Sequence, residues 1–334
     1  MNVLSLFDGM SCGQIALASL GVFPDTYYAS EIDKYAIKQT MLNFPDTVQL
    51  GSVTDIDPKD LPSIDLLMGG SPCQSFSFAG KRQGMITTDN VEITDLDQYM
   101  NLKRLGFKFE GQSYLFWEYV RILDYVRKTN PDIKFLLENV VMSKKWERVI
   151  TEVLGVEPIM INSSLVSAQN RKRLYWTNIE GVTVPDDEGI FLGDILESNV
   201  PEKYYVSEHL YGSKRVSDNV RDHLLDDLKR LDQRVYGISV LSDGIRPYRD
   251  DKRKSGSGSI GTIRFEGSKG DTLLTGRPQL VITDRLRRLT PDECARLQTV
   301  PYWYKWDCSD TQQYRMLGNG WTVKVIEHIL TNLF

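Results

Sequence analysis

The sequence predicts an α/β fold, a doubly wound and mostly parallel sheet, accompanied by a smaller, loop-rich β domain. Short apolar runs alternate with segments of helical periodicity up to about residue 180, which favours a parallel sheet with helices on both faces. From Gly181 to Ile282 the chain is richer in charged, glycine and serine residues, and helical periodicity returns at Thr290. The predicted parts are a sheet domain at 1–180, a small domain at 181–283 and a segment at 284–334 that returns to the sheet domain.

The first strand, turn and helix have the form of a ligand site. A strand at Val3–Phe7 leads through Asp8-Gly-Met-Ser-Cys-Gly13 into a helix at Gln14–Leu20, whose N-terminus can receive an anionic or polar group. A second strand, Tyr27–Ser30, ends in Glu31, and an acid about 20 positions after such a turn is the usual partner of ribose hydroxyls. The turn lacks the second glycine that lets a pyrophosphate approach, which favours a nucleoside without phosphates, such as S-adenosylmethionine. Ordinary strand–helix geometry is the alternative.

Further polar groups are expected at the carboxyl ends of later strands, where open α/β sheets bind their ligands. Cys73 follows a short apolar run after Gly-Gly-Ser-Pro, which suits a presented nucleophile. Glu138 ends another apolar strand, and Arg171 and Arg173 precede a third. The ordinary alternatives are a buried cysteine, a helix-capping acid and a solvated pair of charges. Together, beside the nucleoside turn, these residues predict one site.

The remaining elements follow from the same periodicity. Helices are expected at Asp33–Asn43, Ser113–Lys128, Val149–Leu154, Thr290–Gln298 and Val323–Leu333. Strands are expected at Leu66–Met68, Lys134–Leu137, Glu157–Asn162 and Leu174–Asn178. The segment Lys81–Gln112 is polar and lacks apolar periodicity, and a structureless stretch of that length is typical of a functional lid or binding loop.

Composition argues against several classes of protein. No run of 18 apolar residues is present and the N-terminus lacks the features of a signal peptide, so no membrane association is expected. The chain has four cysteines, none of them in a Cys-x-x-Cys pair, and three histidines that lack the spacing of metal ligands. These features favour a reduced, cytoplasmic protein without a metal site. The net charge of −5 argues against a nucleic-acid partner only on average, because basic residues gather between Arg246 and Lys254.

Six short motifs, in order along nearly the whole chain, resemble those of the prokaryotic and phage cytosine-C5 DNA methyltransferases. They are Phe7-Asp-Gly-Met-Ser-Cys-Gly13, Ser71-Pro-Cys-Gln-Ser-Phe-Ser77, Glu138-Asn-Val140, Gln169-x-Arg171-x-Arg173, Arg288-Leu-Thr-Pro-Asp-Glu-Cys-Ala-Arg-Leu-Gln298 and Leu317-Gly-Asn-Gly-Trp-Thr-Val323. Two positions depart from the family pattern. Ser52 stands where the family usually has an acid for the adenine amine, so that Ser52 or Asp55 is left for this contact. Gly320-Trp321 replaces the commoner Ser/Ala-Val.

The resemblance implies an enzyme that transfers a methyl group from S-adenosylmethionine to C5 of a cytosine flipped out of double-stranded DNA, at a short specific sequence. Cys73 would add to C6 of the ring, and Glu138 would engage N3 and the exocyclic amine. Arg173 would hold O2, while Arg171 would support the Cys73 loop and the adduct. The base that later removes the C5 proton is not indicated by the sequence.

The resemblance also implies contacts to the cofactor and to DNA. The cofactor-binding positions are Phe7, Asp8, Gly9, Gly13, Glu31, Val53, Leu115, Asn319 and Trp321. The DNA-binding positions are Gln74, Ser75, Lys81, Arg82, Gln169, Arg246, Thr262 and Arg264. The small domain at 181–283 would be the target-recognition domain, and a monomer is expected.

Two alternative functions are compatible with the same residues. A tRNA methyltransferase of the same fold would carry a reduced recognition domain, whereas about 100 residues separate Gly181 from Ile282 here, which favours DNA. A DNA-binding protein without catalysis would have no need of Cys73, Glu138 and the two arginines together. The recognition sequence, a companion restriction enzyme, and a host or phage origin are not indicated.

Overall fold

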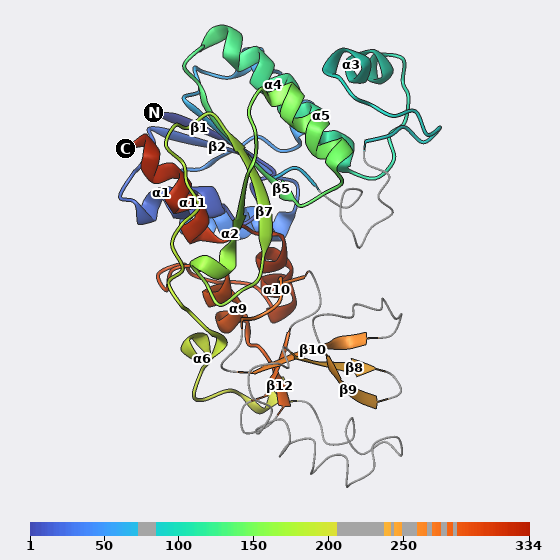
Figure 1. The fold of residues 1–334 in the computed structure, drawn as a ribbon. Coiled ribbons are helices and arrows are strands. Elements are labelled where there is room, and N and C mark those ends of the chain that lie inside the picture. The colour runs from blue at the N-terminus through green and yellow to red at the C-terminus, as the bar shows by residue number, and fades with distance from the viewer. Residues whose placement is uncertain are drawn as a thin grey trace.

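The fold is described from a computed structural model, which places residues 1–72, 85–205, 237–241, 244–248, 259–265, 269–274, 279–282 and 286–334. A seven-stranded sheet has the order β3-β2-β1-β4-β5-β7-β6 (Figure 1). Its strands are β1 (Asn2–Leu6), β2 (Thr26–Ser30), β3 (Val48–Gln49), β4 (Leu66–Gly69), β5 (Lys134–Val140), β6 (Ile159–Asn162) and β7 (Lys172–Thr177). All are parallel except β7, which runs antiparallel to both of its neighbours. The predicted doubly wound, mostly parallel α/β fold is confirmed.

Apolar side chains alternate between the two faces of this sheet, as the period of two in a strand requires. In β4, Leu66 and Met68 belong to one core and Leu67 to the other. Each core is covered by helices, since a sheet buried on both faces needs a layer on each (Figure 1). One face carries α1 (Cys12–Ser19), α2 (Lys34–Asn43) and α11 (Val323–Leu330), and the other α4 (Phe116–Thr129) and α5 (Lys144–Leu154).

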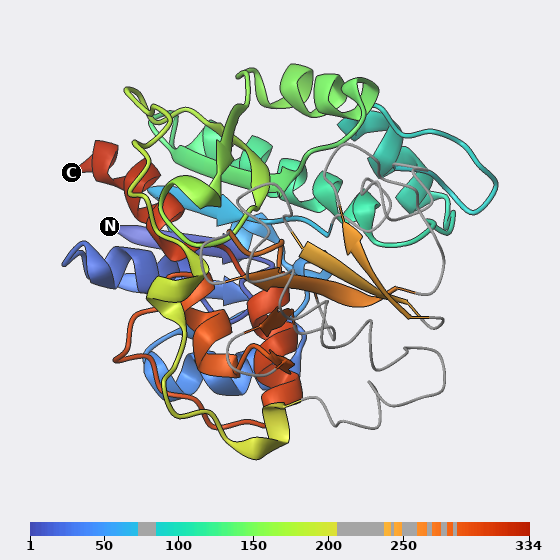
Figure 2. The same cartoon turned by 60° about the horizontal axis from the view of Figure 1, so that its bottom comes forward.

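A second, five-stranded sheet has the order β12-β11-β10-β8-β9 and lies at the other end of the molecule in Figure 1, and it comes forward in Figure 2. Its strands are β8 (Gly237–Leu241), β9 (Gly244–Tyr248), β10 (Ser259–Phe265), β11 (Leu280–Ile282) and β12 (Leu286–Arg288). The last of these strands lies beyond residue 283, where the small domain was predicted to end. Short helix α6 (Leu192–Ile195) precedes this sheet in the chain, while α9 (Pro291–Leu297) and α10 (Asp310–Asn319) follow it and lie between the two sheets (Figure 1).

Three of the described α-helices were not predicted, namely the short α6 and two longer helices, α3 (Leu96–Arg104) and α10, that bury few side chains. Helix α3 lies within the segment expected to be structureless, which corrects that prediction. It buries only Tyr99 and is defined instead by its Asp95 N-cap and by Lys103 and Arg104 in its last turn. Helix α10 buries only Met316 and Leu317, so its apolar period is equally weak. In the described part of the chain, no helix is long and apolar enough to cross a membrane.

Candidate active site

Glu138 and Arg173 form an ion pair at the carboxyl edge of the main sheet. Glu138 of β5 is paired in register with Tyr175 of β7, and Val140 with Arg173, so Glu138 and Arg173 are diagonal neighbours across the two strands. The Arg173 Nε lies 2.8 Å from Glu138 Oε1, and only 13% and 11% of the two side chains are exposed. The sequence placed both residues in one site, and the antiparallel β7 explains how they come into contact.

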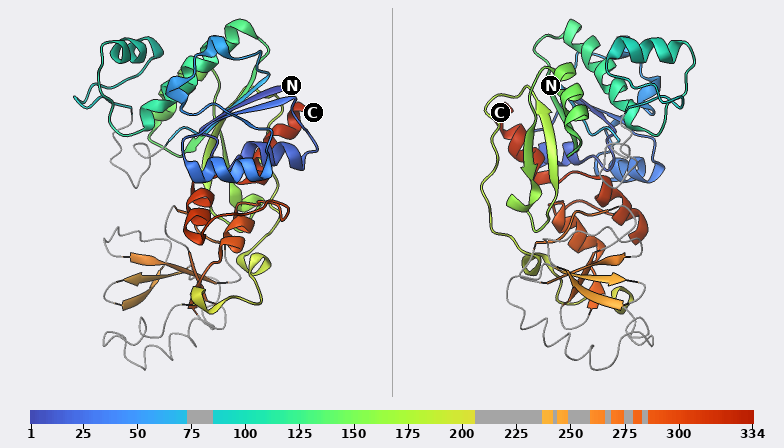
Figure 3. Two further views of the ribbon diagram at one scale, coloured as in Figure 1. Left: turned by 180° about the vertical axis from the view of Figure 1, so that it is seen from behind. Right: turned by 45° about the vertical axis from the view of Figure 1, so that its right-hand side comes forward.

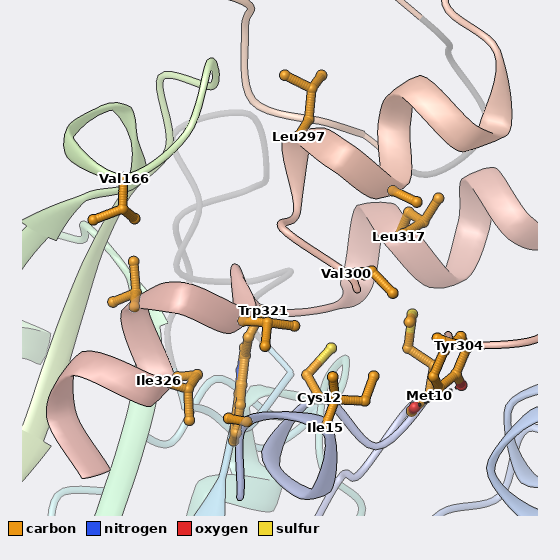
Figure 4. Packing of buried hydrophobic residues seen from close by; sticks show 14 of the residues in the cluster. Met10, Cys12, Ile15, Val166, Leu297, Val300, Tyr304, Leu317, Trp321 and Ile326 are labelled. Atoms are coloured by element: carbon orange, nitrogen blue, oxygen red, sulfur yellow. Dashed lines mark hydrogen bonds between the residues drawn. The ribbon is translucent and has the colours of Figure 1, made fainter. Parts of the chain in front are cut away.

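The second Glu138 oxygen accepts a hydrogen bond from Trp321, which lies between α10 and α11. The indole Nε1 is 3.2 Å from Oε2, and both residues are buried. Trp321 packs in the core with Cys12 and Ile15 of α1 (Figure 4). The segment expected to bind the cofactor therefore also reaches Glu138.

The end of β4 brings the chain close to this carboxylate just before Cys73. A Cβ on Gly70 would lie 2.8 Å from Trp321 Nε1 and 3.1 Å from Glu138 Oε2, so a side chain here would push the pair apart. Asn139 Nδ2 donates to Ser71 Oγ at 3.0 Å, which fixes the chain two residues before Cys73. Asn139 was not singled out in the sequence, although it stands next to Glu138. Cys73, Gln74, Ser75, Lys81 and Arg82 lie outside the described residues.

Arg171 is buried and donates hydrogen bonds to main-chain carbonyls. Its guanidinium donates to the Gly320 and Gly318 oxygens, at 2.9 and 3.2 Å, and to Leu273 O at 3.3 Å. Arg171 therefore fixes the turn that precedes Trp321. Its predicted support of the Cys73 loop stays a prediction.

The turn after β1 has the strained backbone of a ligand-binding turn. Phe7, Gly9 and Ser11 all have positive φ, and Gly9 N donates to Glu31 Oε2 at 2.8 Å. The other Glu31 oxygen accepts from the backbone N–H groups of the next two residues, at 2.7 and 2.8 Å. Glu31 is thus oriented between the turn and the start of α2. Ile32, whose side chain is 72% exposed beside it, is a further surface for a base that sequence reasoning missed.

Asp8 lies buried in the same turn with one oxygen free of partners. Tyr27 donates its hydroxyl to Asp8 Oδ1 at 2.9 Å, while Oδ2 is buried without a hydrogen-bond partner in the described part of the molecule. Burial raises the pKa of this carboxyl from 3.8 to about 6.

The other predicted cofactor positions border this turn or lie further from it. Val53 is buried in a short 3₁₀ turn (Val53–Asp55) capped by Ser52, and Asp55 is exposed. Leu115 is half-buried at the start of α4, and Gly13 packs against Met68. Asn319 is exposed at the end of α10 rather than in a loop. Among the described residues, no cluster of three or more histidine, cysteine or acidic side chains could hold a metal ion.

Comparison with known proteins assigns the chain to a family. The model of the C-5 cytosine-specific DNA methylases matches residues 1–98 and 101–334. The chain belongs to this family. The methylase is 29% identical to the type II methyltransferase M1.ScrFI of Lactococcus lactis subsp. cremoris, over 90% of the chain and 70% of that protein. It is 28% identical to M.NlaX of Neisseria lactamica, over 98% and 94%, and 26% identical to the orphan methyltransferase M.SPRI of Bacillus phage SPR, over 100% and 97%.

Solved structures share the fold of the methylase. A DNMT2 mutant from Spodoptera frugiperda matches with a TM-score of 0.65 at 19% identity, covering 100% of this chain and 99% of that one. A putative DNA modification methyltransferase encoded within an Escherichia coli prophage gives a TM-score of 0.62 at 19% identity, covering 100% and 98%. The methylase is therefore a DNA cytosine-C5 methyltransferase in family and in fold.

The segment 88–108 of the methylase contains the predicted insertion at Asp89–Leu105, closes on itself and is fixed to α4. Thr88 N donates to Lys108 O at 2.9 Å, so the two ends of the insertion meet. Glu118 of α4, fully buried, accepts from the Tyr99 hydroxyl, from Lys103 Nζ at 2.5 Å and from Arg121 Nε at 2.8 Å. Figure 3 shows α3 beside α4 and away from the sheet. The insertion is thus an ordered element and not an open loop.

Of the predicted DNA-binding positions that the structure describes, three lie in the second sheet of the methylase and Gln169 lies outside it. Arg246 of β9 and Thr262 of β10 both pair with Ser239 of β8, at one level across three strands. Arg264 pairs with Val281 further along β10. Gln169 is instead buried, with its amide bound to Leu297 O and to Leu273 N. A DNA contact by Gln169 would require it to leave these partners.

Proposed function

We propose that the methylase transfers a methyl group from S-adenosylmethionine to C5 of a flipped-out cytosine, through a bond between Cys73 and C6. The observation that carries the proposal is the Glu138–Arg173 pair at the carboxyl edge of the sheet, beside the chain that leads into Cys73. A carboxylate and a guanidinium side by side match the amine, N3 and O2 groups along one edge of cytosine.

Each proposed step changes one bond of the ring. The Cys73 thiolate adds to C6, which breaks the 5,6 double bond and makes C5 nucleophilic. As negative charge moves onto the ring, a proton shared between the Glu138 carboxyl group and N3 neutralises it, and the other Glu138 oxygen accepts a hydrogen bond from the amine. After methylation, a base takes the C5 proton, the S–C6 bond breaks and the double bond is restored. The thiol must ionise for this role, and burial raises the pKa of the Cys12, Cys294 and Cys308 thiols, which supports Cys73 over the described cysteines.

The turn after β1 fits the cofactor that methyltransferases of this family generally use. S-adenosylmethionine supplies an electrophilic methyl group on a sulfonium, and it carries an ammonium at its amino-acid end. Glu31 suits the ribose hydroxyls, and Ile32 and Val53 offer apolar surface to the adenine. Ser52 and Asp55 both stay open as partners of the adenine amine.

The proposed substrate is double-stranded DNA, which places the protein in the cytoplasm of a bacterial cell or a phage-infected host. C6 is hidden in the base stack, so the target cytosine must leave the duplex before Cys73 can reach it. We propose that residues 181–283 form the target-recognition domain, with Arg246, Thr262 and Arg264 on its DNA side and with Lys81 and Arg82 on phosphates. The enzyme is expected to act as a monomer without a metal.

Trapping on 5-fluorocytosine tests the chemistry. Fluorine at C5 cannot leave as a proton does, so a methylated covalent complex should persist through denaturing electrophoresis with labelled cofactor. The Cys308→Ser variant should form the same complex, and Cys73→Ser should form none. Wild-type protein that methylates unmodified DNA without forming this complex would refute the Cys73 mechanism. Methylation of tRNA in place of DNA would favour the RNA alternative, and bisulfite sequencing would identify the DNA site.

A further inference from the structure

The Glu138 carboxylate is held from two sides by different parts of the chain. Arg173 of β7 reaches Oε1 at 2.8 Å, and the Trp321 indole N–H reaches Oε2 at 3.2 Å. A carboxylate has about four acceptor positions, two on each oxygen. The two donors therefore leave about one acceptor position on each oxygen for a substrate.

The Trp321 side chain has little freedom to move away from this carboxylate. Arg171 and Gln298 donate to the Gly320 carbonyl directly before it, at 2.9 and 3.1 Å. The indole is 8% exposed in the core beside α1 (Figure 4), and the Gly70 backbone lies against its Nε1. The direction of the N–H is thus set by the packing around the ring rather than by Glu138.

We propose that Trp321 is a positioning residue, whose indole N–H fixes the plane of the Glu138 carboxylate for the cytosine. This inference rests on the proposed function of Glu138. By the family resemblance, Trp321 contacts the cofactor through its main chain, which a change of side chain leaves in place, whereas its ring contacts Glu138. The family more often has a small residue and valine in place of Gly320-Trp321. In this chain, Trp321 gives the proposed catalytic acid, Glu138, a second hydrogen-bond donor.

Replacing Trp321 with Phe tests the donor while keeping an aromatic ring. A hydrogen bond to a charged group contributes enough that its loss should slow single-turnover methyl transfer by about 10- to 100-fold. The dissociation constants for DNA and cofactor should change by less than about threefold, because the fold and both binding surfaces remain. The matched control is Trp117→Phe, since Trp117 is also buried and its indole N–H has no hydrogen-bond partner among the described residues. This variant should transfer methyl groups at the wild-type rate.

A double-mutant cycle with Glu138→Gln separates positioning from packing. If Trp321 acts through Glu138, Trp321→Phe should cost much less in the Glu138→Gln background than in the wild type. An equal cost in both backgrounds, or a wild-type rate for Trp321→Phe, would overturn the inference. Wild-type protein that transfers no methyl group to DNA would instead overturn the proposed function.

Nuclear magnetic resonance gives a measurement that does not depend on activity. In protein labelled with [¹⁵N]tryptophan, the indole resonance that disappears in Trp321→Phe belongs to Trp321. That resonance should move in Glu138→Gln, because the charged acceptor becomes neutral, while the Trp117 resonance should stay in place. An unmoved Trp321 resonance would show that the hydrogen bond is absent.

Discussion

The pH dependence of folding stability should report the buried carboxyl of Asp8. Its pKa rises from 3.8 to about 6 on folding, chiefly because burial disfavours the charged form. Between these two values the folded state binds more protons than the unfolded state, so the free energy of unfolding falls as the pH rises through this window. A shift of about two units at about 1.4 kcal/mol each corresponds to about 3 kcal/mol, fully lost above the folded pKa.

The Asp8→Asn variant removes this titration. An amide keeps an acceptor for the Tyr27 hydroxyl and carries no charge, so the variant should be more stable than the wild type at pH 7.5, by up to about 3 kcal/mol. At pH 4 the two proteins should be nearly equal, because the wild-type carboxyl is then protonated in the folded state. Urea unfolding of cofactor-free protein between pH 4 and pH 8 measures both differences.

The Tyr27→Phe variant tests the same site by raising the pKa of the Asp8 carboxyl further, where Asp8→Asn removes the titration. Tyr27 donates to the carboxyl and stabilises its ionised form, so loss of the hydroxyl should move the upper end of the window to higher pH. Two results together would refute the reasoning: a wild-type free energy of unfolding that stays constant from pH 4 to pH 6, and a free energy of unfolding for Asp8→Asn that equals the wild-type value at pH 7.5. If the positive charge of the cofactor lies at Asp8 Oδ2, cofactor should reduce the difference in free energy of unfolding between Asp8→Asn and the wild type at pH 7.5.

Three further substitutions test the described contacts. Glu118→Gln should lower the free energy of unfolding by about 3 kcal/mol in urea titrations, because it leaves the buried donors of α3 and α4 without their anion. Arg287→Met should cost about 3–5 kcal/mol by breaking its buried pair with Glu293, and the double variant with Glu293→Met should regain at least half of that loss. Gly70→Ala should slow methyl transfer about tenfold or more at nearly unchanged melting temperature, since its Cβ would displace the Glu138 carboxylate.

Much of the main sheet could be predicted from the sequence because its strands are short, apolar and buried on both faces. The runs at β1, β4 and β5 carry no competing signal, and polar residues mark where they end. Placing Glu138 at the carboxyl edge needed only the rule that parallel strands end together, whereas Arg171 and Arg173 stand at the start of β7 and reach this edge because β7 is antiparallel. The reversed direction of β7 was not visible in the sequence, and it is this direction that sets Arg173 diagonally against Glu138.

The contacts that were missed depend on residues far apart in the chain. Trp321 and Glu138 are separated by 183 positions, and no local pattern connects an indole in a C-terminal turn with an acid in β5. Helix α3 was missed for a related reason, since its stability comes from Glu118 on another helix more than from its own apolar face. Periodicity detects a buried face, whereas a helix held by a few polar contacts gives almost no periodic signal.

The self-closing insertion makes the methylase suitable for engineering at one defined point. Its two ends are joined by backbone hydrogen bonds, so the distance between the chain entering at Ile86 and the chain leaving at Glu110 does not depend on what lies between them. Leu105 is 69% exposed at the end of α3, and Gly106 follows in a left-handed turn. A reporter or affinity domain joined after Gly106 by flexible linkers would leave the Glu118 contacts in place, at only a small entropic cost for the longer loop.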